Sequence, residues 1–92
     1  DCSYFSMICM RQAGVSLPRL SKEQVNTGSA VGSFYDAVPG DLFFYNSHGF
    51  GIDHVAIYIG DNKILHASQS IGCVSISVYD YCGEPVAIRR YY

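Results

Sequence analysis

The first part of the chain carries apolar residues at helical spacing. Between residues 2 and 13, Phe5, Ile8 and Cys9 recur at intervals of three and four residues, which predicts an amphipathic helix. Gly14 comes directly after this segment and is a natural residue for a helix C-terminus. We therefore expect the chain to begin with a helix, capped at its start by Asp1 or Ser3.

A second, shorter helix is predicted after the first. Ser21 is followed three residues later by Gln24, which has the form of a capping box. This helix would end at Gly28, and small residues from Gly28 to Ser33 predict a loop.

From Val38 onward the spacing changes from helical to alternating. Pro39 and Gly40 mark a turn, and each apolar segment after them is short and is bounded by turn residues. The predicted strands are 41–45, 54–59, 64–68, 73–78 and 86–92. A helical segment followed by sequential strands predicts an α+β domain with an antiparallel sheet.

Composition narrows the class of protein. A chain of 92 residues suits one domain, and a hydrophobic content of 49% with 15% charge fits a compact fold. The net charge of −2 and the lack of a basic cluster longer than Arg89-Arg90 argue against nucleic acid as a partner. No segment is long and apolar enough to span a membrane. No signal peptide precedes Asp1, where the chain begins inside a motif.

The four cysteines do not form a disulfide scaffold. They include no C-x-x-C pair, so a zinc site built with the histidines is not favoured, and we expect no metal and no cofactor. Cys73 and Cys82 could pair only if neighbouring strands brought them together.

Three residues suggest nucleophilic catalysis. Cys2 lies where the first helix is predicted to begin, and the N-terminus of a helix favours a thiolate. His54 and His66 lie on two successive predicted strands. A thiol, a base and a residue that orients the base are the parts of a cysteine hydrolase. His48, in the polar loop between two strands, is a weaker candidate.

The register of the hairpin decides whether the two histidines can meet. A three-residue turn at 61–63 would place them on one face, but His66 would then lie opposite Tyr58, about 13 Å along the strand from His54. A two-residue turn at Asp61-Asn62 would place them on opposite faces. Contact requires a bulge, bend or strong twist that the sequence does not reveal.

Several sequence blocks resemble the NlpC-type cell-wall peptidases. They occur in that family's order and cover nearly the whole chain. The blocks are Asp1-Cys2-Ser3 before a helix, 13–19, Ser21-x-x-Gln24, 39–42, 54–60 and 64–68.

The resemblance implies a papain-like fold in which a nucleophile helix packs on an antiparallel sheet. By matching positions, Cys2 is the expected nucleophile, His54 the base and His66 the residue that orients it. The family typically hydrolyses peptidoglycan stem peptides, commonly at the bond between D-glutamate and a diamino acid. Its members are mostly secreted or surface-attached proteins of bacteria and phages, and the parent chain could carry further wall-binding domains.

The residues beside the cysteine are expected to bind substrate. In the family, Asp and Ser at these positions help to hold the polar end of the substrate, which makes Asp1 and Ser3 candidates, with helix capping as the alternative. Tyr4 replaces the family's usual Gly, and its ring could narrow the cleft. The helix that usually precedes the nucleophile is missing from residues 1–92, so we expect one peptidase domain without that helix.

Two other functions fit the same pattern. One is a related papain-like amidase or acyltransferase. The other is a catalytically idle module that binds cell-wall peptide, with Tyr4 blocking the cleft.

Overall fold

The structure, a computed structural model, describes residues 2–46, 49, 51–68 and 73–91. Its helical elements are α1 (Cys2–Gln12), α2 (Ser21–Gln24) and the 3₁₀ turn η1 (Phe34–Asp36). Its strands are β1 (Ser29–Ala30), β2 (Leu42–Tyr45), β3 (His54–Gly60), β4 (Lys63–Ser68), β5 (Cys73–Val78) and β6 (Ala87–Arg90).

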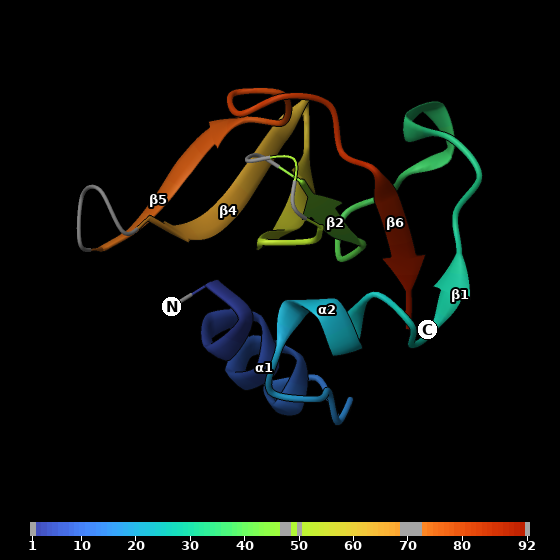
Figure 1. Cartoon of the computed structure of the whole chain (residues 1–92), viewed down its shortest axis with the longest axis vertical. Coiled ribbons are helices and arrows are strands. Elements are labelled where there is room, and N and C mark those ends of the chain that lie inside the picture. Colours follow the sequence, from blue (N-terminus) through green and yellow to red (C-terminus); the bar gives the residue numbers. More distant parts are fainter. Residues whose placement is uncertain (1, 47–48, 50, 69–72, 92) are drawn as a thin grey trace.

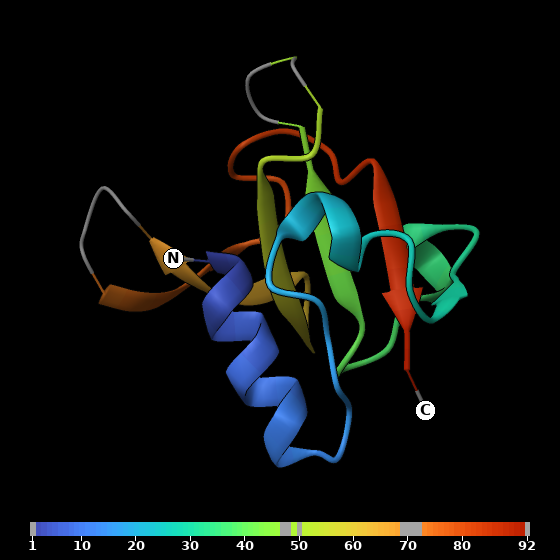
Figure 2. The ribbon, with the colours of Figure 1, turned by 60° about the horizontal axis from the view of Figure 1, so that its bottom comes forward.

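Over the described residues the strands form one six-stranded sheet in the order β1-β6-β2-β3-β4-β5. Every neighbouring pair is antiparallel. Helices α1 and α2 cover one face, and the segment between β5 and β6 arches over the other (Figure 1). Figure 2 shows α1 lying along the sheet with its start beside β4. The structure confirms the predicted α+β fold, in which the first helix packs on an antiparallel sheet.

Alternation along β2 and β3 divides the apolar residues between two cores. On the helix side, Leu42, Phe44 and Val55 pack with Cys2 and Met10 of α1. On the opposite face, the buried residues are Phe43, Tyr45, Ala56, Tyr58, Ile64 and Ile88. Both faces of the central strands are therefore buried, which explains why all four residues of β2 are inaccessible to solvent.

The end of α1 follows the predicted pattern. Gly14 has φ +85°, and its N–H donates to the carbonyl of Arg11 at 3.0 Å. The N–H of Val15 donates to the carbonyl of Met10 at 2.8 Å, which completes a Schellman motif.

The expected capping box at α2 is wrong. The helix is capped by Leu20, which makes no side-chain capping bond. The amide of Gln24 instead donates to the carbonyls of Ser3 and Pro18, at 2.9 and 2.8 Å. Because Gln24 is fully buried, its side chain ties the 15–20 segment to the start of α1 rather than closing its own helix.

The loop predicted from Gly28 to Ser33 contains a strand. Ser29 and Ala30 form β1 and pair with Arg90 and Arg89 of β6. The segment is too short and too rich in small residues for an alternating pattern to identify it.

Candidate active site

Cys2 lies at the first residue of α1, as expected. It is 9% exposed and belongs to the same apolar cluster as Val55, the residue that follows His54 on β3. Helix α1 contacts both β3 and β4, the two strands that carry the histidines.

The turn between β3 and β4 has two residues, the length that by itself would place the histidines on opposite faces of the sheet. Gly60 pairs with Lys63, and Asp61 and Asn62 have φ of 54° and 63°, as in a two-residue type I′ turn. The register then shifts between Tyr58 and Gly60, where β3 carries a bulge.

This bulge places the two histidines on the same face of the sheet. It inserts one extra residue into β3, so that Tyr58 pairs with Ile64 and Ile57 with Leu65. One step further in the same register, His66 lies level with Ala56, two residues from His54 and on the same face. The four-residue offset expected from a three-residue turn is therefore wrong.

The histidines form a hydrogen-bonded chain. His54 Nε2 lies 3.2 Å from His66 Nδ1, with the two rings edge to face at a centroid distance of 5.1 Å. His66 Nε2 lies 2.9 Å from Ser77 Oγ on β5. Because both nitrogens of His66 are engaged and the ring is 1% exposed, its orientation is fixed, and it in turn fixes His54.

Both imidazoles are held in the neutral form. Burial, and to a lesser extent the neighbouring His66, lower the pKa of His54 to about 4, while Asp53 opposes the shift. Burial also lowers the pKa of His66. At neutral pH His54 therefore has an unprotonated nitrogen and can accept a proton.

The residues beside Cys2 have different surroundings. Ser3 lies inside α1, is 6% exposed, and its hydroxyl accepts a hydrogen bond from Arg19 Nη1 at 3.1 Å, so it does not cap the helix. Tyr4 is 45% exposed, and its ring lies under the guanidinium of Arg19 at 5.1 Å. Asp1 and His48 lie outside the described residues.

Three contributors were not identified from the sequence. Ser77 extends the histidine chain, Arg19 braces Ser3 and Tyr4, and the hydroxyl of Tyr81 lies 3.1 Å from His54 Nε2. Ser77 lies on a predicted strand, but its contact with His66 depends on the register between β4 and β5, which the sequence does not give. Tyr81 lies in the β5–β6 segment, where no periodic pattern exists.

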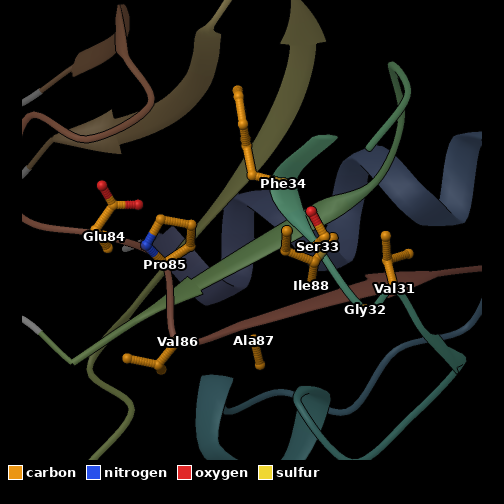
Figure 3. A pocket seen from close by; sticks show the side chains of 9 residues that line it. All are labelled: Val31, Gly32, Ser33, Phe34, Glu84, Pro85, Val86, Ala87 and Ile88. Atoms are coloured by element: carbon orange, nitrogen blue, oxygen red, sulfur yellow. The ribbon is translucent and has the colours of Figure 1, made fainter. Parts of the chain in front are cut away.

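A pocket of ≈ 180 Å³ lies elsewhere, between the start of η1 and the segment that leads into β6 (Figure 3). Val31, Phe34, Pro85 and Ile88 contribute to its walls, and neither the histidines nor Cys2 does. This pocket is separate from the predicted catalytic residues.

Three further findings concern a disulfide, a metal site and a membrane-spanning helix. Cys82 carries a free thiol, so it forms no disulfide. Across residues 2–46, 49, 51–68 and 73–91, no group of three or more His, Cys, Asp or Glu could hold a metal ion. Within the same ranges, no helix has the length and apolar character needed to cross a bilayer.

Comparison with known proteins links this geometry to a family. The model of the NlpC/P60 family matches residues 1–87. The chain is 35% identical over 96 residues to the gamma-D-glutamyl-L-lysine dipeptidyl-peptidase of Bacillus cereus, covering 99% of this chain and 28% of that protein. It is 39% identical over 92 residues to the murein DD-endopeptidase MepS/murein LD-carboxypeptidase of Escherichia coli, covering 99% of this chain and 46% of that one.

The fold is also similar to that of a solved structure. The peptidoglycan hydrolase RipB of Mycobacterium tuberculosis superposes with a TM-score of 0.84 at 37% identity, over 98% of this chain and 44% of that one. The chain therefore spans less than half the length of each of these three proteins.

Proposed function

Since the chain belongs to the NlpC/P60 family, we propose that it is a cysteine peptidase that hydrolyses peptidoglycan stem peptides. The observation that carries this proposal is the chain from His54 Nε2 to His66 Nδ1 at 3.2 Å and on to Ser77. It engages one nitrogen of His54 and leaves Nδ1 as the basic atom. The names of the Bacillus cereus and Escherichia coli relatives support peptidoglycan as the substrate.

The proposed reaction is acyl transfer through Cys2. His54 Nδ1 takes the thiol proton, and the thiolate sulfur attacks the peptide carbonyl to form a tetrahedral oxyanion. N–H groups at the start of α1 stabilise this oxyanion, a kind of contact whose loss costs about 2.7–4 kcal/mol in other enzymes. His54 then gives its proton to the leaving amine, and water hydrolyses the thioester to regenerate the thiol.

The lowered pKa of His54 supports a resting state in which both the imidazole and the Cys2 thiol are neutral. A neutral imidazole beside a thiol can act as a general base, whereas a preformed imidazolium would have to overcome the burial that disfavours its charge. We therefore propose that proton transfer from Cys2 accompanies substrate binding.

The substrate-binding assignments differ in their support. Tyr4 presents a half-exposed ring next to the guanidinium of Arg19, which suits a substrate that carries a carboxylate. Ser3 is buried under Arg19, so we propose that it acts by positioning that guanidinium. Asp1 remains a proposal from the family resemblance alone.

The bond that is cleaved is proposed as the one between D-glutamate and the diamino acid. The name of the Bacillus cereus relative supports this bond, while that of the Escherichia coli relative includes other bonds of the same polymer. An enzyme with this substrate would work outside the cytoplasm, at the cell wall.

The test is to incubate the purified protein with a defined muropeptide and identify the products by mass spectrometry. We expect cleavage after D-glutamate, reduced on the order of 10⁴-fold or more in Cys2→Ala. Cys9→Ala is the matched control, because it removes a thiol from the same helix, and it should keep wild-type activity. Full activity of Cys2→Ala would overturn the assignment, and transfer of the acyl group to an added amine would favour an acyltransferase.

A further inference from the structure

The hydroxyl of Tyr81 forms a triangle with the two histidines. It lies 3.1 Å from His54 Nε2 and 3.3 Å from His66 Nδ1, while those nitrogens are 3.2 Å apart. Each of the three atoms is thus within hydrogen-bond distance of the other two. Tyr81 belongs to neither strand of the pair, so its presence there is not a consequence of the β3–β4 register.

The fold holds Tyr81 in this place through its backbone. Its N–H donates to the carbonyl of Val78 at 3.2 Å, and the next turn closes from Gly83 N to the carbonyl of Asp80 at 3.1 Å. Just before it, the carbonyl of Tyr79 accepts from the Tyr45 hydroxyl at 2.6 Å. The segment between β5 and β6, which arches over this face of the sheet (Figure 1), is thereby attached to the core that contains Tyr45.

The protons of the triangle can be assigned from the hydrogen-bond network. If Nε2–H of His66 donates to Ser77, then Nδ1 of His66 is an acceptor. The Tyr81 hydroxyl can donate to that Nδ1, and its oxygen can accept from Nε2–H of His54. Every group then donates once, and His54 is left in the tautomer whose Nδ1 is unprotonated.

The phenol is suited to this position because it stays protonated. Burial, and then the neighbouring thiols of Cys82 and Cys2, raise the pKa of Tyr81 to about 12. It therefore supplies a proton at any pH at which the reaction would run. A water molecule in its place could donate in either direction, whereas the phenol oxygen is fixed by its ring.

We propose that Tyr81 is a positioning residue for the catalytic base, holding His54 in the Nε2–H tautomer by accepting from it and donating to His66. This inference rests on the proposed role of His54 as the base that activates Cys2. When His54 takes the thiol proton, the phenol oxygen accepts from the resulting imidazolium. When the proton passes to the leaving amine, the same hydrogen-bond pattern remains.

Several groups around His54 influence its charge besides Tyr81. They are His66 on β4, Asp53 at the end of the preceding loop, and the Tyr45 ring on β2, whose centroid is 5.8 Å away. Cys82 hydrogen-bonds the Tyr81 side chain, and Cys2 on α1 is within electrostatic reach of it. A test must therefore remove the hydroxyl alone.

Tyr81→Phe does so, since it keeps the ring that lies 4.8 Å from His66. Nitrogen-15 spectra of the imidazoles report the tautomers, and alkylation of Cys2 by iodoacetamide, located by peptide mapping, reports activation of the thiol without any substrate. We expect the wild type to hold His54 in the Nε2–H form. In Tyr81→Phe, the tautomers should mix and Cys2 alkylation at neutral pH should slow roughly two- to tenfold.

Tyr79→Phe is the matched control, as its phenol lies two residues away and stacks on Phe34. It should change neither readout. An Nδ1–H tautomer in the wild type, or unchanged spectra and alkylation in Tyr81→Phe, would overturn the inference. Failure of this inference can be told apart from failure of the proposed function, because the tautomer of His54 is measured without substrate. A protein that does not cleave muropeptide could still hold His54 in the Nε2–H form.

Discussion

At the scale of single residues, the site depends on keeping an imidazole uncharged in a partly buried setting. His54 borders the core formed by Tyr45 and Ala56, where a positive charge loses most of its hydration. If the Nε2–H of His66 donates to Ser77, the Nδ1 of His66 carries a lone pair that can accept a hydrogen bond from the pair formed by His54 and Tyr81. The burial that lowers the pKa of His54 must also make the stability of the fold depend on pH.

We predict that the protein loses stability as the pH falls from 6.5 towards 4. An unfolded His54 takes up a proton at its ordinary pKa of 6.5, whereas the folded one resists until about 4. Across this interval the unfolded state binds more protons, so its free energy falls relative to the folded state. His66, whose pKa is also lowered, adds to the same trend. Urea titrations at several pH values measure the effect.

His54→Gln isolates this contribution, because glutamine is polar but does not titrate. The free energy of unfolding of the variant should depend less steeply on pH between 6.5 and 4. Equal slopes for the two proteins would show that other groups cause the acid sensitivity.

At the scale of elements, the β3–β4 hairpin brings the site together. Its two-residue turn alone would leave the histidines on opposite faces, and the bulge before Gly60 corrects this. The sequence predicted both strands and both histidines, because alternation and turn residues are local signals. It could not predict the bulge, because Gly60, which has φ +91° beside the bulge, cannot be told from one more turn residue next to Asp61 and Asn62 in the sequence.

The capping box failed for a related reason. Ser21 and Gln24 have the local spacing of a cap, but Gln24 is buried against two carbonyls from outside α2. An amide in the interior must satisfy those partners, and this outweighs a weak local preference. The spacing of residues along the sequence cannot predict tertiary partners of this kind, and the hydrogen bonds from Tyr81 to the histidines are another example.

The turn of this hairpin should tolerate glycine at position 62 and resist valine. Asn62 has φ 63°, a conformation that costs a β-branched residue about 1–2 kcal/mol. We expect Asn62→Val to lower the free energy of unfolding by that amount and to weaken peptide cleavage with it. Asn62→Gly is the control and should be at least as stable as the wild type. Equal urea midpoints for the two variants would contradict the assigned turn.

At the scale of the whole molecule, the helical half of the chain must dock on the sheet to bring α1 against β3 and β4. The helical half is tied to the sheet through the Tyr91 hydroxyl, which lies 2.9 Å from the Thr27 hydroxyl and 3.2 Å from the carbonyl of Gln24. On the other side, Asp41 is fully buried and receives two hydrogen bonds from Arg90, each of 2.9 Å. The C-terminal end of β6 therefore holds contacts with both halves of the chain.

Gly28 lies close against the end of β6 and the residue that follows it. It has φ +69°, and a Cβ there would lie 2.7 Å from the carbonyl oxygen of Arg90 and 2.7 Å from the Tyr91 ring. Backbone strain and overpacking together should make Gly28→Ala cost about 2–5 kcal/mol. Gly14→Ala provides the comparison, because Gly14 also has a positive φ but nothing within 4 Å of its Cβ position.

In urea titrations, the free energy of unfolding of Gly14→Ala should fall by only about 1–2 kcal/mol, because backbone strain is the only cost there. The difference between the two alanine variants thus measures the docking contact itself. Because that contact connects the helical half to β6, Gly28→Ala should also slow Cys2 alkylation, while Gly14→Ala should not. Equal losses of stability would mean that the two halves dock without needing the small residue at this position.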